Sequence, residues 1–218
     1  KRPTPHHQRE ITFLHVALSK QRVQFAQHRP ALGHQQHAAG VAVESMHQFH
    51  SQTDEAVRLA KYIVARLQGN HVVWLLGGDG NYKDPYEQRW KYIGQQVFDS
   101  IDNAPVTLHP QGSSWIGELF EDEDWLDIIA YQSSHSNERR VVDWINKGPM
   151  AKQWDKLPPR PLINLEPNYE EIHFRITAED VRNASYWSIF ATPLAGITYG
   201  ANGIWPWIQK DGDLVENH

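Results

Sequence analysis

Residues 71–79 read HVVWLLGGD, a short apolar run that ends in two glycines and an acid. An unbroken run of β-branched, aromatic and leucine side chains is typical of a strand covered on both faces in a parallel sheet. Asp79 therefore lies at the carboxyl end of a buried strand, where α/β proteins place their functional residues. Because the glycines lack the G-x-G-x-x-G spacing and the lysine of a phosphate loop, we expect no nucleotide, and the prediction for the chain is no cofactor.

Strand and helix patterns repeat on both sides of this run. Upstream, apolar residues between 54 and 67 fall on one helix face, and Thr53 is the expected N-cap. This alternation predicts a parallel sheet with right-handed crossovers. Downstream, strands are predicted at 105–109, 127–131, 161–165 and 195–199, and helices at about 85–101, 138–146 and 178–191, the last capped by Thr177.

Polar, aromatic or small residues follow each of the five predicted strands. In a closed barrel all strand ends meet at one mouth, whereas an open sheet concentrates its functional residues at one switch point. We therefore predict an α/β fold of the (β/α)8 TIM barrel type. The residues at the strand ends are Asp79, His109, Gln132 with Ser133, Glu166, and Tyr199.

The first fifty residues differ in composition from the rest. They hold eight of the thirteen histidines and seven glutamines but no Asp, Asn, Trp or Tyr. Only ITFLHVAL, residues 11–18, fits a strand or a short helix. We predict two parts: an anomalous His/Gln-rich segment, 1–50, and the carboxyl-terminal part of a catalytic domain, 51–218. The segment is interpreted as a disordered extension, a sequence read in the wrong frame, or a metal-binding stretch through His34/His37 and His47/His50.

Composition excludes several classes of function. The net charge of -5 gives no electrostatic reason to expect nucleic acid or an anionic membrane as a partner. The absence of cysteine rules out disulfides and thiolate metal sites. No apolar run reaches membrane-spanning length, and Lys1 does not begin a recognisable signal peptide. The nine Trp and eight Tyr fit a protein that grips sugar rings, although large apolar cores use them as well.

Two strand-end acids, Asp79 and Glu166, form a candidate catalytic pair. Retaining glycosidases use one carboxylate as nucleophile and a second carboxyl as acid and then base. Asp79 follows a long apolar run, so we expect dry surroundings that favour its protonated form. Spacing alone also fits two acids that cap helices or form salt bridges.

Six motifs follow one another along the chain at the strand ends and in the last predicted helix. They are VVWLLGGDGNY (72–82), VTLHPQGSSW (106–115), DWLDIIAYQSSHS (124–136), PLINLEPNYE (161–170), DVRNASYWSIFA (180–191) and GITYGANGIW (196–205). In this order they resemble the motifs of the apiosidase-like glycoside hydrolases, which belong to a clan of retaining (β/α)8 enzymes, and the resemblance covers about residues 53–207. It implies that Asp79, closing the fourth strand, is the acid/base and that Glu166, closing the seventh, is the nucleophile. It also implies cleavage of a linkage to a terminal sugar, apiose in the named activity, in plant cell-wall polysaccharides.

The remaining polar and aromatic strand-end residues are predicted to bind the carbohydrate. His109, Gln132 and Tyr199 are placed to hydrogen-bond sugar hydroxyls or to orient Glu166, and Trp205 to form a stacking wall. For His109 and Trp205, plain packing is the competing interpretation. The full predicted binding set is Asn81, His109, Gln132, Ser133, His135, Tyr169, Tyr199 and Trp205.

On this resemblance the chain holds strands 4 to 8 of the barrel, because three strands would precede residue 71. A partial barrel leaves open edges and an exposed apolar lumen. We therefore expect the chain to be a fragment with weak activity on its own. The family resemblance implies that the protein is secreted or periplasmic. Two other classes remain: a metal-dependent hydrolase using Asp79, His109, His135 and Glu166, and an inactive sugar-binding fragment.

Overall fold

The computed structural model of the protein describes residues 12–16, 38–156 and 159–201, with side chains described from residue 52 onward. Helices separate the strands along this part of the chain, except that the third and fourth strands follow one another with no helix between them, and all strand pairs are parallel. The elements are β1 (Thr12–Val16), α1 (Ala38–Leu67), β2 (Val72–Gly80), α2 (Glu87–Phe98), β3 (Val106–Pro110), β4 (Ile129–Gln132), α3 (Arg139–Lys147), α4 (Pro149–Gln153), β5 (Leu162–Glu166), the 3-10 helix η1 (Ile172–Phe174), α5 (Ala178–Ala191) and β6 (Gly196–Ile197).

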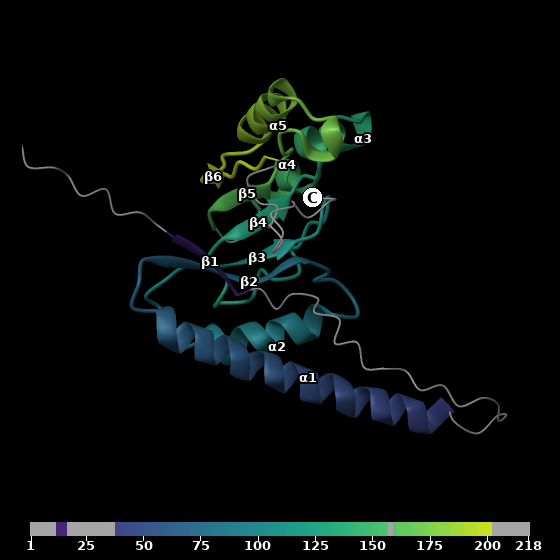
Figure 1. Ribbon diagram of the computed structural model, residues 1–218, viewed down its shortest axis with the longest axis vertical. Helices are drawn as coiled ribbons and strands as arrows, with labels where there is room; N and C mark the ends of the chain where they lie inside the picture. The colour runs from purple at the N-terminus through teal and green to yellow at the C-terminus, as the bar shows by residue number, and fades with distance from the viewer. Residues whose placement is uncertain (1–11, 17–37, 157–158, 202–218) are drawn as a thin grey trace, which may run out of the picture.

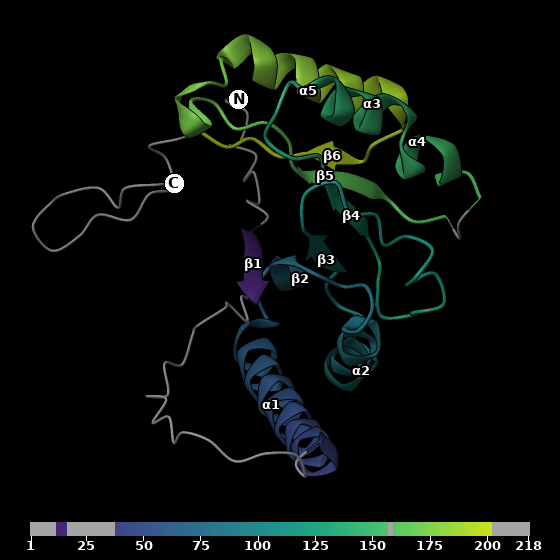
Figure 2. The ribbon, with the colours of Figure 1, turned by 90° about the vertical axis from the view of Figure 1, so that its right-hand side faces the viewer.

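The strands follow one another across the sheet in the order of the sequence. Two three-stranded sheets, β1-β2-β3 and β4-β5-β6, are connected by a parallel bridge between Thr107 and Ile128. Figure 2 shows β2 to β6 rising in order from the layer of α1 and α2 to the layer of α3, α4 and α5. The five predicted strands are confirmed, and β1 adds one strand that pairs with β2 and precedes the predicted set.

Side-chain alternation separates two faces of the sheet. On the outer face, Trp74 and Leu76 of β2 and Leu108 of β3 pack in one cluster with residues of α1 and α2, which lie side by side in Figure 1. On the inner face, five residues form a second buried cluster, so the exposed lumen expected from the sequence is not observed at these positions. They are Val73, Leu75, Ile128, Ala130 and Leu165.

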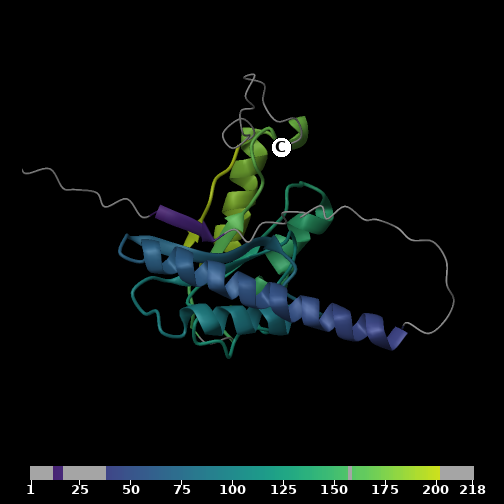
Figure 3. The same ribbon diagram turned by 60° about the horizontal axis from the view of Figure 1, so that its bottom comes forward.

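The start of α1 differs from the prediction. The helix begins at Ala38 rather than after Thr53, and its amino-terminal half extends past α2 and the strands (Figure 3). Residues 38–52 include the helix formers Ala, Gln, Met and Glu, and no helix-breaking proline separates Ala38 from Thr53. Thr53 is buried inside the helix instead of capping it. The helix also crosses residue 50, where the two-part division was predicted, and that division stays a prediction.

The other helix signals agree with the structure. Val57, Ala60 and Val64 of α1 are buried, as their spacing predicts. Thr177 caps α5 in a reciprocal capping box with Asp180: each residue's side chain accepts a hydrogen bond from the other's backbone N–H. No helix within the described ranges is both long enough and apolar enough to cross a membrane.

Candidate active site

The site is centred on Glu166, the last residue of β5. One carboxylate oxygen lies 2.8 Å from His109 Nε2, at the end of β3, and the other lies 2.8 Å from His135 Nε2, in the segment after β4. The three side chains are 10–16% exposed. Three separate strand ends therefore bring one carboxylate and two imidazoles together, as expected where parallel strands finish at one edge.

The two histidines keep Glu166 ionised. Burial raises the pKa of the Glu166 carboxyl, but hydrogen bonds from His109 and His135, together with their charges, outweigh burial and hold the pKa at about 2. His135 also contacts the Pro167 carbonyl oxygen through Nδ1 at 2.9 Å. Because a carbonyl oxygen and a carboxylate both accept, His135 satisfies both neighbours when both ring nitrogens carry protons.

Tyr169 covers the other side of this cluster. Its ring centroid lies 4.5 Å from that of His135. Burial, the charge of Glu166 and a hydrogen bond to Glu166 raise the pKa of the Tyr169 hydroxyl, and the charge of Asp79 adds to the effect. The charges of both candidate carboxylates, Glu166 and Asp79, thus contribute to the raised pKa of Tyr169. The hydroxyl is a neutral donor to Glu166 at ordinary pH.

Asp79 lies at the end of β2 in an irregular stretch of backbone. The pairing of β2 with β3 shifts register between Leu76 and Gly80, and Gly77 and Asp79 have φ angles of 70° and 38°. Such bulges re-aim side chains next to active sites. The Asp79 side chain is exposed, so the dry surroundings expected from its apolar neighbours in sequence are not observed. The side chains of the preceding strand residues, Val72 to Leu76, are buried, whereas the bulge turns the Asp79 side chain to the surface.

Gln132 and Ser133 lie next to Glu166 across β4 and β5. Gln132 is the cross-strand partner of Glu166 and is 6% exposed. Its Oε1 is buried, with no hydrogen-bond partner in the described part of the chain. Such an acceptor beside the carboxylate suits a hydroxyl donor from a ligand. The Ser133 hydroxyl is instead fully buried and accepts from Asn164 Nδ2 at 3.1 Å.

Three other predicted residues lie apart from the cluster or outside the structure. Asn81 accepts from the Lys83 N–H at 3.0 Å in the loop before α2. Tyr199 is exposed and donates to Glu170 at 2.7 Å. Trp205 lies outside the described residues. The histidines at 34, 37, 47 and 50 lie outside the residues whose side chains are described.

The sequence analysis missed Asn164. It is fully buried on β5, two residues before Glu166, and accepts a hydrogen bond from the Glu166 N–H at 3.2 Å. The available signal was a single amide residue inside the otherwise apolar stretch PLINL. A polar side chain within a buried strand requires a hydrogen-bond partner, and one partner of Asn164 is the backbone N–H of Glu166.

The geometry favours a hydrogen-bonded carboxylate over a metal centre. Both Nε2 atoms lie 2.8 Å from Glu166 oxygens, and both histidines interact with this carboxylate, whereas a metal ligand needs a free nitrogen lone pair. Among the residues described, no group of three or more His, Asp or Glu side chains has an arrangement that could hold a metal ion.

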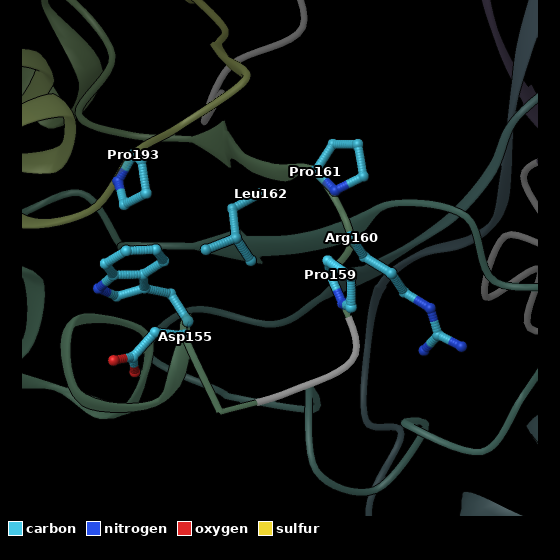
Figure 4. Close-up of a pocket in the computed structure, with 7 residues that line it drawn as sticks. Asp155, Pro159, Arg160, Pro161, Leu162 and Pro193 are labelled. Atoms are coloured by element: carbon cyan, nitrogen blue, oxygen red, sulfur yellow. The ribbon is translucent and has the colours of Figure 1, made fainter.

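A cavity lies at the opposite end of β5. Its volume is about 650 Å³, and it is lined by Trp154, Asp155, Pro159, Arg160, Pro161, Leu162 and Pro193 (Figure 4). Leu162 begins β5 and Glu166 ends it, so this cavity is at the amino end of the strand. Size alone does not make it the site, because the ionised and hydrogen-bonded groups lie at the carboxyl end.

Two solved glycoside hydrolase structures are similar to this chain. The crystal structure of a glycoside hydrolase family 5 protein from Bacteroides vulgatus ATCC 8482 has a TM-score of 0.60 at 30% identity, over 70% of this chain and 36% of the other. A second structure, named a glycoside hydrolase, has a TM-score of 0.61 at 27% identity, over 72% and 40%. The chain thus spans 36–40% of the length of these structures. Its fold is thus similar to part of the fold of these glycoside hydrolase structures.

The family of the chain is shown by sequence. A family model described as "Apiosidase-like, catalytic domain" matches residues 31–217, and the chain belongs to this family. The resemblance stated for residues 53–207 is confirmed, and the match also includes residues 31–52. No curated protein matches the sequence.

Proposed function

We propose that the chain is the catalytic region of an enzyme that hydrolyses a glycosidic bond with retention of configuration. The observation that carries this proposal is the Glu166 carboxylate, held ionised by two histidines at 2.8 Å each. A retaining enzyme needs an ionised carboxylate aimed at the anomeric carbon, and fixed donors keep that carboxylate in one orientation. Glu166 is the nucleophile of this mechanism.

Asp79 is the general acid and then the general base. In the first step it gives its proton to the leaving oxygen while Glu166 forms a covalent bond to the sugar. In the second step it takes a proton from the water that releases the sugar from Glu166. The support is its position at a strand end of the same sheet edge and the influence of both carboxylates on Tyr169.

The sheet is proposed to form part of a (β/α)8 barrel. Six parallel strands in sequence order, with helices on the outer face, agree with a barrel and lack the reversal of order of a doubly wound sheet. If β2 is the fourth strand, as the family motifs imply, β1 is the third. The predicted set of strands 4 to 8 then becomes 3 to 8.

The substrate is proposed to be a plant-type polysaccharide or oligosaccharide from which the enzyme, like an apiosidase, cleaves a terminal sugar. Gln132 offers a buried acceptor beside Glu166, and Tyr169 offers a ring and a hydroxyl. Both suit the hydroxyl groups and apolar ring faces of a sugar. Asn81, Tyr199 and Trp205 stay predicted contacts for parts of the substrate further from the reacting bond.

The test is turnover of aryl glycosides and pectic oligosaccharides by the wild-type chain and two variants. We expect Glu166→Gln to abolish turnover of every substrate. Asp79→Asn should lower turnover on the order of 100-fold or more for natural leaving groups, since general acid catalysis contributes about that much. For nitrophenyl leaving groups, which depart without a proton, kcat/KM should fall little because it reports the first step, whereas kcat should still fall because the second step needs Asp79 as base.

Asp143→Asn is the matched control, because Asp143 forms surface ion pairs with Arg139 and Lys147, a type of contact that contributes little. Activity that survives Glu166→Gln contradicts the mechanism. Loss of activity in a chelator would indicate the metal-dependent hydrolase instead. Sugar binding without turnover in the wild type, unchanged by Glu166→Gln, would indicate a binding module.

A further inference from the structure

The side chains of β5 do not alternate regularly between the two faces of the sheet. Leu162 packs with Met150 of α4 in a separate cluster on the outer face. Asn164 also faces outward, since it hydrogen-bonds Ser188 of α5. Leu165 faces inward, in the cluster with Val73 and Leu75 of β2. Regular alternation would send the next side chain, Glu166, outward to α5.

Glu166 instead points to the inner face. It contacts His109, whose neighbour Leu108 packs against the helices on the outer face, so His109 lies on the inner one. Leu165 and Glu166 thus share a face. The pairing of β4 with β5 shows why: Tyr131 pairs with Asn164 and Gln132 with Glu166, so Leu165 is an extra residue, as in a β-bulge.

A bulge interrupts the ladder and leaves backbone groups that need other partners. At this bulge the Glu166 N–H donates to the side-chain oxygen of Asn164 at 3.2 Å. The Asn164 Nδ2 donates to Ser133 Oγ at 3.1 Å and to Ser188 Oγ at 3.0 Å. Asn164, Ser133 and Ser188 are all fully buried.

The orientation of the Asn164 carboxamide is therefore fixed. Ser188 donates its hydroxyl proton to the Ala184 carbonyl at 2.8 Å, so its oxygen is left to accept from Asn164. A flipped amide would set Nδ2 against the Glu166 N–H, two donors facing each other in a buried place. The contacts from β4 and α5 thus select the one orientation that accepts from Glu166.

We propose that Asn164 is a positioning residue for Glu166: its carboxamide stabilises the bulge that turns the Glu166 side chain to the inner face, between His109 and His135. The effect of this role on catalysis rests on the function proposed above. The effect on the position of the Glu166 side chain does not, because the bulge and its contacts exist without a substrate.

The experiment compares Asn164→Ala with Asn168→Ala. Asn168 is the matched control: it is also fully buried, but it bonds Asn137 and the Asp180 carbonyl and does not contact Glu166. Titration of the Glu166 carboxyl is followed by ¹³C NMR with labelled glutamate, the resonance being assigned by its absence in Glu166→Gln. No substrate is needed for this readout.

In Asn164→Ala the Glu166 side chain loses its place between the histidines. We expect its titration midpoint to rise by about one pH unit or more, toward the ordinary carboxyl value. Asn168→Ala should leave the midpoint at the wild-type value. In the active enzyme, kcat should fall on the order of 100-fold with little change in KM, because the reacting group is displaced while sugar contacts remain.

A folded Asn164→Ala protein with the wild-type midpoint would overturn the proposal. If that variant does not fold, the titration midpoint of Glu166 in Ser188→Ala and Ser185→Ala decides. Ser188→Ala should raise it, whereas Ser185→Ala, one turn earlier in α5, should not; equal midpoints in these two variants overturn the proposal.

The two proposals fail separately. A wild-type chain without glycosidase activity contradicts the proposed function, and the Glu166 titration still decides the role of Asn164. A titration unmoved by Asn164→Ala in an active enzyme contradicts only the positioning role.

Discussion

Glu166 shows how a buried carboxyl is kept charged. Removing it from water favours the neutral form, and each hydrogen bond from His109 or His135 favours the charged form. The donors prevail. The same contacts that orient the carboxylate therefore also set its protonation state, so orientation and charge are tested by the same substitutions.

The first prediction concerns stability in acid. The folded-state pKa of Glu166 is lowered from 4.5 to about 2, so the carboxylate stabilises the fold above about pH 4.5, and this contribution is lost as the pH falls toward 2. The free energy of unfolding of the wild type should therefore fall by about 2–3 kcal/mol more than that of Glu166→Gln between pH 5 and pH 2. Urea unfolding at several pH values measures it. Parallel curves for the two proteins would show that Glu166 has no such contacts.

Gly200 provides a second test at the level of single residues. A Cβ atom there would lie 2.4 Å from two carbons of the Tyr169 ring, so Gly200→Ala must displace that ring, whose centroid lies 4.5 Å from that of His135. Overpacking of this kind costs about 1–3 kcal/mol. Gly196→Ala is the control, because its Cβ would meet only Ile163, at 3.9 Å.

We expect Gly200→Ala to lower both the melting temperature and the turnover of aryl glycosides, and Gly196→Ala to change neither by much. Equal effects of the two substitutions would mean that the contact between Gly200 and Tyr169 does not support the site. Melting curves and initial rates give the two readouts.

Among the elements, α2 carries a close contact that reverses the usual rule for glycine. Alanine normally stabilises a helix interior by about 1 kcal/mol relative to glycine. At Gly94, however, a Cβ atom would lie 2.1 Å from the Trp125 ring, which is buried and donates its N–H to Glu123 at 2.7 Å. Gly94→Ala should therefore destabilise the protein by about 1–3 kcal/mol.

The control for Gly94→Ala is Gln96→Ala, at an exposed position of the same helix. Thermal or urea unfolding should show a loss of stability for the first substitution and no loss for the second. Stabilisation by Gly94→Ala would mean that Trp125 does not pack against this helix.

The elements also show what the sequence could predict. Runs of apolar residues locate β2 to β6, and Thr177 with Asp180 locates the start of α5, because these signals are local. The start of α1 at Ala38 was missed because Ser, Thr and Asp near residue 53 look like a cap whether or not a helix already runs through them.

The candidate site was predicted only in part, for a related reason. Residue type and strand position indicate Asp79, His109 and Glu166. The bulges in β2 and β5 depend on pairing with neighbouring strands, so no local pattern shows that Glu166 turns inward or that Asp79 is exposed. The contacts of His135 and Asn164 with Glu166 follow from those bulges and were out of reach for the same reason.

At the scale of the whole chain, the protein belongs to the apiosidase-like family and spans 36–40% of the length of two similar glycoside hydrolase structures. Its strands run in sequence order from β1 to β6, and the carboxyl ends of β2, β3 and β5 carry Asp79, His109 and Glu166. At this scale we propose that the strand ends act together in one retaining mechanism with Glu166 as the nucleophile.

The most direct test is to identify the residue that becomes covalently linked to the sugar. The protein is incubated with a fluorinated glycoside whose leaving group departs quickly and whose glycosyl-enzyme hydrolyses slowly, and the digested protein is mapped by mass spectrometry. We predict a single added glycosyl group on the peptide that contains Glu166, and none in Glu166→Gln. A glycosyl group on another peptide, or hydrolysis that inverts the anomeric configuration, would contradict the account.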